Sequence, residues 1–330
     1  MRYGMLLPHF GEHFSRDRII DGAQMLEDLG FDSLWVRDHL LWKPHGMEGD
    51  NRTFIEAFVT LAAAAGVTKR IGLGTGVVIP IRWPLKVAHD FASLSRLAGR
   101  EVEAGFGMGS NSVELGAAGF NRDDRKGIFA ETVEICRRVW AEDDVSFHGE
   151  HFSFDGVTIE PKPIGQPMTW YGGTTRGSVR RAVAHCDGWL PGRLPMATLD
   201  NRLALLRELN EREGRTVRAG VIPLTAVDED PAVARANVDI AAVAGSSEGA
   251  ASWIKPPSGE FRTIEDLEGL LVSGTPEDCV RQIKAFEERG VETYIFDLRL
   301  QFDRFEEKAE MIARDVLPHL RSALPVATAG

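Results

Sequence analysis

The hydrophobic and polar positions along the chain alternate between two periods, one typical of buried strands and the other of amphipathic helices. A short apolar run at residues 2–8 is followed by a segment at 15–29 whose apolar side chains fall on one helical stripe, and then by a second apolar run at 31–39. A helix between two short strands is typical of a βαβ unit, in which the two strands are parallel.

This unit repeats along the whole chain. Eight strands, each followed by a helix, predict one (β/α)8 TIM barrel over residues 1–330, an α/β fold. A doubly wound open sheet shares the alternation, but eight repeats are more than such a sheet usually contains. The predicted strands cover residues 2–8, 31–39, 71–79, 101–109, 168–173, 188–191, 220–227 and 291–298. The predicted helices cover residues 15–29, 53–66, 84–97, 123–141, 178–185, 199–212, 275–290 and 304–320.

Two insertions interrupt the repeat. Residues 145–162 alternate apolar and polar positions around Gly149 and Gly156, which predicts a β-hairpin. Residues 230–272 lose the alternation altogether. A segment of that length inside a compact domain is usually functional, so we expect it to be a mobile lid or a partner surface.

Composition excludes several classes of protein. The net charge is −11 and lysines and arginines are interleaved with acids, which speaks against nucleic-acid binding. The longest apolar run, around residues 58–65, is too short to cross a membrane. The three cysteines lack CxxC spacing, which argues against a disulfide framework or a zinc knuckle and favours the cytoplasm. His148 and His151 fall in the predicted hairpin, too exposed for a metal site, so no metal is expected.

In a (β/α)8 barrel the active site lies at the C-terminal ends of the strands. Gly74, Thr75 and Gly76 interrupt the third strand at that end, where glycine weakens a strand unless a close approach requires it. This strand end is therefore predicted to form one wall of a ligand site. The glycines at 105–109 fall at every second position, unlike G-x-G-x-x-G, and are predicted to clear room on one face of the fourth strand.

The sequence Tyr171-Gly-Gly-Thr-Thr175 opens a predicted helix. Backbone N–H groups and the helix dipole favour an anion there, and phosphate is the simplest occupant. The alternative is that Gly173 and Thr174 only cap the helix.

His39 is the best acid/base candidate, because imidazole titrates near neutrality and this residue ends the second predicted strand. Asp38 precedes it, but adjacent strand residues point to opposite faces, so Asp38 is not expected to orient His39. The alternative is a structural histidine bonded to a backbone carbonyl.

The order of motifs along nearly the whole chain resembles the bacterial luciferase-like family of flavin and deazaflavin oxidoreductases. The motifs are GFDSLWVRDHL, IGLGTGVVIPIRWPLKVAHDFASLSRLAGR, GFGMGS, VSFHGEHFSFDGVTIEPKP, WYGGTTRGSVRRAVAHCDGWLPG and VSGTPEDCVRQIKAFEERGVETYIFDL. The resemblance implies an oxidoreductase whose cofactor is coenzyme F420 or FMN.

The resemblance also implies a cofactor site. The family's non-prolyl cis peptide would fall between Gly76 and Val77, against the central ring of the cofactor. The residues so implied are Thr75, Gly76 and Val77 beside the ring, Met108, Gly109 and Ser110 flanking it, and Gly172, Gly173, Thr174 and Thr175 at the phosphate.

The pair Asp38 and His39 matches many F420-dependent members, whereas FMN monooxygenases of the family more often have Glu-His-His at this place. The resemblance therefore favours F420-dependent hydride transfer to or from a small organic substrate, with His39 and Asp38 as catalytic residues. Sugar-phosphate dehydrogenases of that branch carry a glutamate after the fourth-strand glycines, where this chain has Ser110 and Asn111. Glu114 lies further along and is not a match, which speaks against a sugar-phosphate substrate.

Two other functions are compatible with the motifs: a reduced-FMN monooxygenase that uses O2, and a non-catalytic flavin-binding homologue. The resemblance further implies a homodimer, a small-molecule substrate, and, as a partner, a flavin or F420 reductase that supplies reduced cofactor.

Overall fold

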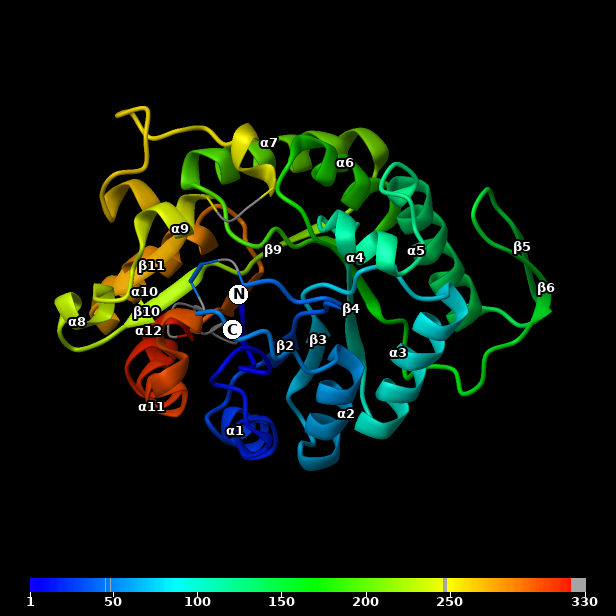
Figure 1. The fold of residues 1–330 in the computed structure, drawn as a ribbon, viewed down its shortest axis with the longest axis horizontal. Helices are drawn as coiled ribbons and strands as arrows, with labels where there is room; N and C mark the ends of the chain where they lie inside the picture. The colour runs from blue at the N-terminus through cyan, green and yellow to red at the C-terminus, as the bar shows by residue number, and fades with distance from the viewer. Residues whose placement is uncertain (45, 48, 246–247, 322–330) are drawn as a thin grey trace, which may run out of the picture.

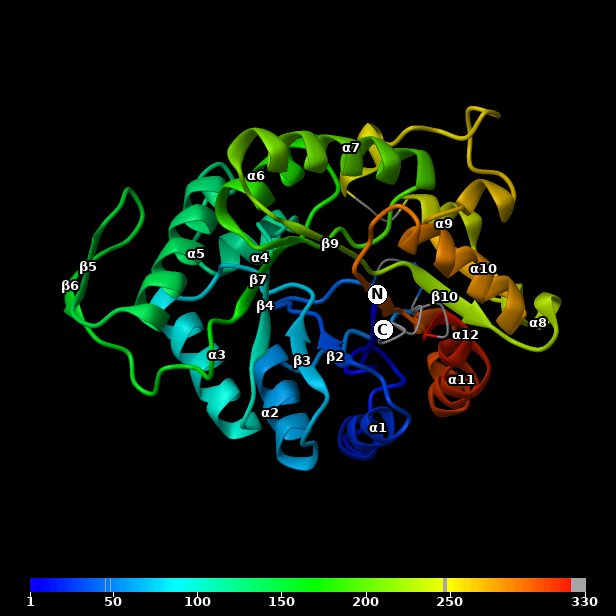
Figure 2. The same ribbon diagram turned by 180° about the vertical axis from the view of Figure 1, so that it is seen from behind.

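The computed structural model describes residues 1–44, 46–47, 49–245 and 248–321. Eight parallel strands close into a barrel in the order β1, β12, β9, β8, β7, β4, β3, β2, and the helices surround it (Figures 1 and 2). The predicted (β/α)8 barrel is confirmed and the open-sheet alternative is wrong. The barrel strands are β1 (Arg2–Leu6), β2 (Ser33–Val36), β3 (Gly72–Thr75), β4 (Val102–Phe106), β7 (Met168–Tyr171), β8 (Gly188–Trp189), β9 (Arg218–Val221) and β12 (Thr293–Phe296).

The helices bury their apolar stripes against the barrel, and Figure 1 shows most of them as an outer ring. Their ends follow local signals, because Ser15 caps the first one and Thr275 forms a capping box with Asp278 ahead of the tenth. The main helices are α1 (Arg16–Asp28), α2 (Ala57–Val67), α3 (Pro84–Ala98), α5 (Arg125–Ala141), α6 (Arg176–His185), α7 (Met196–Glu213), α10 (Pro276–Glu287) and α11 (Phe305–Met311), and the last continues through a π turn (Ile312–Val316) into α12 (Leu317–Arg321). A short helix, α4 (Ser112–Ala117), lies between β4 and α5 and was not predicted.

The first insertion is a hairpin, as predicted. Strands β5 (Val145–His148) and β6 (Ser153–Val157) pair antiparallel. Both ribbon views show the hairpin projecting from one edge of the molecule, away from the second insertion (Figures 1 and 2).

The seventh predicted strand, at 220–227, is split in two. Pro223 separates β9 from β10 (Leu224–Val227), because proline has no N–H with which to continue a ladder. Strand β10 instead pairs in parallel with β11 (Leu271–Gly274), a strand that the sequence placed partly in an irregular insertion. Between these two strands the second insertion forms α8 (Pro231–Arg235), α9 (Ile240–Gly245) and two 3-10 turns (Glu248–Ser252 and Glu265–Leu267).

The C-terminal end of β3, which the sequence predicted as one wall of a ligand site, packs against β4. The peptide bond between Gly76 and Val77 is cis, as the family resemblance implied. A Cβ on Gly105 would overlap the Thr75 carbonyl oxygen, and a Cβ on Gly107 would lie 2.6 Å from Cγ2 of Val77. The room predicted on the face of β4 is therefore filled by β3 itself, and only glycine fits there.

We predict that Gly105→Ala lowers the free energy of unfolding by at least about 3 kcal/mol or prevents folding, because the new methyl group meets backbone that cannot move alone. Gly116→Ala is the matched control, since a Cβ at this helical position meets no atom within 4 Å. It should leave stability unchanged or raise it by up to about 1 kcal/mol. Urea unfolding of both variants checks the prediction, and equal midpoints would contradict it.

Candidate functional site

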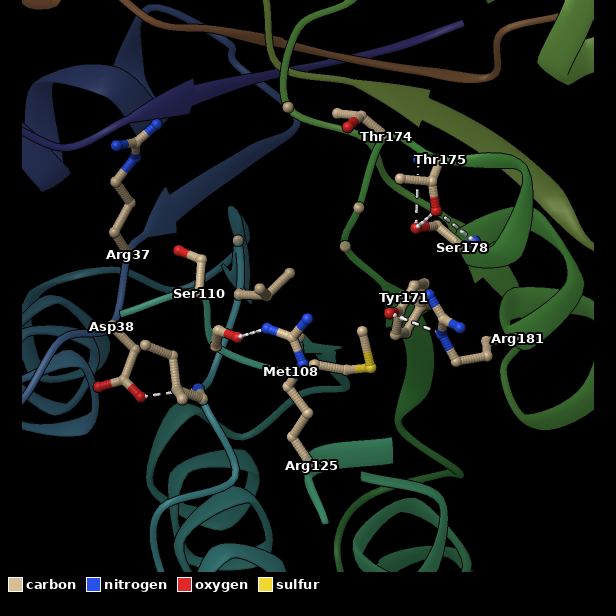
Figure 3. Close-up of a pocket in the computed structure, with 18 of the residues that line it drawn as sticks. Arg37, Asp38, Met108, Ser110, Arg125, Tyr171, Thr174, Thr175, Ser178 and Arg181 are labelled. Atoms are coloured by element: carbon tan, nitrogen blue, oxygen red, sulfur yellow. Dashed lines mark hydrogen bonds between the residues drawn. The ribbon is translucent and has the colours of Figure 1, made fainter. Parts of the chain in front are cut away.

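A cavity of about 620 Å³ opens at the C-terminal ends of the barrel strands. In Figure 3, Arg37 and Asp38 lie on one side, Tyr171, Thr174, Thr175, Ser178 and Arg181 on the other, and Met108, Ser110 and Arg125 between them. The structure brings together nearly all of the residues predicted from the sequence. These are Asp38, His39, Gly76, Val77, Met108, Gly109, Ser110, Gly172, Gly173, Thr174 and Thr175.

Thr75 is the exception, because it does not line the cavity. Its buried hydroxyl donates to the Gly105 carbonyl (3.0 Å) and accepts from the Gly105 N–H (2.9 Å). This side chain ties β3 to β4, so it supports the wall from behind.

The start of α6 forms one end of the cavity. Thr175 is its N-cap and shares a capping box with Ser178, whose N–H donates to the Thr175 hydroxyl (3.1 Å). The capping alternative was therefore right about the cap but placed it one or two residues early. Within the described part of the chain, no acceptor is present for the backbone N–H groups of Gly173, Thr174, Arg176 and Gly177. Such a cluster at a helix N-terminus favours an anion.

The cavity is also lined by three cations that the sequence analysis did not name: Arg125, Lys126 and Arg181. Arg125 donates to the Gly109 carbonyl (3.1 Å). Arg181 donates to the Tyr171 hydroxyl (2.9 Å) and lies over its ring. Burial raises the pKa of Tyr171, so the phenol stays neutral. Cations therefore gather around the cavity although the whole chain carries a net charge of −11.

Asp38 is buried, and its carboxylate is hydrogen-bonded to groups other than His39, as the strand alternation predicted. Arg82 forms a bidentate ion pair with it, at 2.6 and 2.8 Å, and the Ile79 N–H donates to it at 2.9 Å. The carboxylate thus joins the end of β2 to the segment that follows β3. Its predicted catalytic role stays a prediction, and the contacts favour a structural one.

His39 contacts the carboxylate of a residue, Glu114, that the sequence analysis did not assign to the site. Its Nδ1 lies 3.3 Å from both carboxylate oxygens of Glu114, which comes from the unpredicted helix α4. The two residues are 75 positions apart, and Glu114 is fully buried. A pattern of apolar positions gives no signal for such a pair.

His9, by contrast, is a structural histidine. Its Nε2 accepts from the Arg37 N–H (3.0 Å), so Nδ1 carries the proton and donates to the Ile55 carbonyl (3.0 Å). Burial lowers its pKa from 6.5 to about 3. The neutral ring holds the backbone immediately before Asp38 and His39.

Comparison with known protein families identifies the family of this chain. The model of the luciferase-like monooxygenase family matches residues 1–293. The chain belongs to this family. The resemblance seen in the sequence is therefore confirmed, and the protein is an oxidoreductase of the luciferase-like type.

Curated relatives in this family cover most of the chain. An F420-dependent glucose-6-phosphate dehydrogenase from Intrasporangium calvum is 28% identical over 94% of this chain and 96% of its own length. An F420-dependent hydroxymycolic acid dehydrogenase from Mycobacterium tuberculosis is 29% identical over 75% of this chain and 64% of its own length.

Solved structures share the fold. An F420-dependent secondary alcohol dehydrogenase in complex with an F420-acetone adduct matches with a TM-score of 0.80 and 20% identity, over 97% of this chain and 99% of the other. The monooxygenase RslO1 from Streptomyces bottropensis matches with a TM-score of 0.77 and 24% identity, over the same shares.

Membrane spans and metal sites are two further possibilities for the described residues. No helix there is long and apolar enough to span a membrane. No group of three histidine, cysteine or acidic side chains in that part of the chain is placed to hold a metal ion.

We predict that His9 makes stability fall in mild acid. Because the folded pKa is lowered, its contribution is complete above pH 6.5 and is lost as the pH falls from 6.5 toward 3, where only the unfolded chain takes up the proton. Between pH 7 and pH 5 the loss is about 2 kcal/mol. Urea unfolding at both pH values measures it.

The variant His9→Gln keeps a donor and an acceptor but cannot titrate, so the drop between the two pH values should be about 2 kcal/mol smaller than in the parent. His89→Gln, on the exposed face of α3, is the control and should leave the drop unchanged. An equal pH dependence of His9→Gln and the parent would contradict the assignment.

Proposed function

We propose that this protein transfers hydride between coenzyme F420 and a small organic alcohol or carbonyl compound. One observation carries the proposal: the Val77 wall, the cluster of N–H groups at the start of α6, and His39 all border one cavity. The F420-dependent dehydrogenases among the relatives support the same assignment.

The cavity fits such a cofactor in size and in chemistry. Its volume of about 620 Å³ lies within the usual range for ligand sites. The bulged end of β3 offers an apolar surface at Val77 for a planar ring. The N–H groups of Gly173, Thr174, Arg176 and Gly177 would hold a phosphate. The cations that line the cavity, Arg125, Lys126 and Arg181, would hold other acidic groups of the tail.

When bound, the deazaflavin accepts or returns the hydride. The chain's own residues bind, orient and move a proton. Val77 would support one side of the ring, and the start of α6 would hold the tail. His39 would take the hydroxyl proton of the substrate or give it back. Asp38 and Arg82 would keep the ends of β2 and β3 in register, so Asp38 acts as a positioning residue.

Ser110 lines the cavity at the place where sugar-phosphate dehydrogenases of the F420 branch carry glutamate. We therefore propose a small organic substrate other than a sugar phosphate. We also propose that the protein works as a cytoplasmic homodimer, together with a reductase that supplies reduced cofactor, as the family resemblance implies.

The segment 230–272 is proposed to close over the site when cofactor binds. It packs on α7, where Thr198 accepts from the Ile254 N–H (2.7 Å) and Arg202 donates to the Ser252 carbonyl (3.1 Å). Among the described residues that line the cavity, none comes from this segment. The lid therefore remains a prediction from its position in the chain.

We predict that the purified protein binds F420 at least about tenfold more tightly than FMN, which is about 1.4 kcal/mol of binding free energy. Fluorescence titration with each cofactor at the same salt concentration measures both affinities. Tighter binding of FMN would reject the F420 assignment and favour the reduced-FMN monooxygenase. Binding of neither would reject both.

A matched pair of variants then places the cofactor in the cavity. Arg125→Gln removes a lining cation and should weaken F420 binding by about tenfold, the usual worth of one charge-assisted hydrogen bond. Arg138→Gln, near the other end of the same helix and not among the cavity-lining residues, should change the affinity by less than about twofold. Equal effects of the two substitutions would contradict this placement.

A further inference from the structure

A buried carboxylate, that of Glu114, holds the loop that carries His39. Glu114, at the start of α4, accepts the backbone N–H groups of Leu40 (2.6 Å) and Leu41 (3.0 Å) through its Oε1 atom. The same carboxylate contacts Nδ1 of His39 through both of its oxygens, at 3.3 Å. The helix after β4 therefore fixes both the backbone and the imidazole at the end of β2.

The charge of Glu114 decides which ring nitrogen of His39 holds the proton. Burial opposes ionisation, but the hydrogen bonds from His39, Leu41 and Leu40 outweigh it and lower the pKa of Glu114 below its ordinary value. An ionised carboxylate can only accept hydrogen bonds. Nδ1 of His39 must therefore be the protonated nitrogen when the ring is neutral.

The remaining nitrogen, Nε2, is left for the ligand. The described residues offer it no hydrogen-bond partner, and the side chain borders the cavity. The ring packs against Trp42 and Phe54, with centroids 5.1 and 5.4 Å away, which fixes its plane. His9 lies nearby, but both of its ring nitrogens are bonded to backbone groups, so it cannot pass protons to His39.

We propose that Glu114 is a positioning residue that holds His39 in the Nδ1–H tautomer and so presents Nε2 to the cavity as the atom that takes and returns the substrate proton. This role rests on the proposed function. When an alcohol is oxidised, its C–H bond would break and a bound deazaflavin would receive the hydride. Its O–H bond breaks and the proton goes to Nε2.

The product is a carbonyl compound, and the imidazolium that forms lies against an ionised carboxylate that offsets its charge. Glu114 itself gains no proton. Reduction of a carbonyl compound runs through the same contacts in reverse, with Nε2 giving up its proton.

The test needs neither cofactor nor substrate. The protein is labelled with 15N-histidine, and the ring nitrogen shifts are recorded from pH 6 to pH 10, with the His39 signals assigned by their loss in His39→Gln. In the neutral ring, Nδ1 should show the shift of a protonated nitrogen and Nε2 that of an unprotonated one. A neutral ring with the proton on Nε2 would overturn the proposal, whatever the cofactor proves to be.

The variant Glu114→Gln sharpens the test. If the amide oxygen keeps the Leu40 and Leu41 N–H groups, the amide NH2 faces Nδ1, and the ring should switch to the Nε2–H tautomer. Persistence of the Nδ1–H tautomer in this variant would contradict the role given to Glu114. Should the variant not fold, the spectrum of the parent protein alone decides.

Glu27→Gln is the matched control. Glu27 also accepts three backbone N–H groups, those of Lys69, Arg70 and Ile71, but has no histidine among its hydrogen-bond partners. It should leave the His39 shifts unchanged. F420 affinity is measured separately on Glu114→Gln and should stay within about twofold of the parent. Failure of the parent protein to bind F420 would contradict the proposed function but would not affect the tautomer result.

Discussion

The contact between β3 and the glycines beside it is the constraint on which the site depends. Val77 leaves the line of β3, and its methyl groups would lie 2.6 Å from a Cβ on Gly107 and 2.9 Å from a Cβ on Gly172. The glycines that follow β4 and β7 therefore leave the room into which the Val77 side chain projects. The projecting residue forms a wall of the cavity.

Buried carboxylates then fix the segments around the cavity. Asp38 binds the Ile79 N–H and Arg82, and Glu114 binds two N–H groups of the next loop and the His39 ring. Each carboxylate is satisfied by several donors, which makes a buried charge tolerable. The loops at the strand ends are therefore held by specific hydrogen bonds, and the groups that face the ligand are placed before it arrives.

The sequence predicted the barrel and most of the cavity because those features leave local signals. Strand and helix periods marked eight units, and glycines marked the ends of β3, β4 and β7. Pairs that are far apart in the chain left none. Glu114 contacts His39 from α4, a helix too short to show a helical repeat of apolar positions. Arg125 reaches the cavity from the start of α5. Pro223 was a local signal that the seventh predicted strand is split. The apolar residues on both sides of Pro223 nevertheless led to the prediction of one continuous strand.

The proposed function depends most on where the coenzyme binds. A crystal structure of the protein soaked with F420 tests this directly. We predict that the ring lies against Val77, with His39 on the side open to substrate. The tail phosphate should lie within hydrogen-bonding distance of the N–H groups of residues 173–177. A ring bound elsewhere, or a phosphate held away from the start of α6, would contradict it.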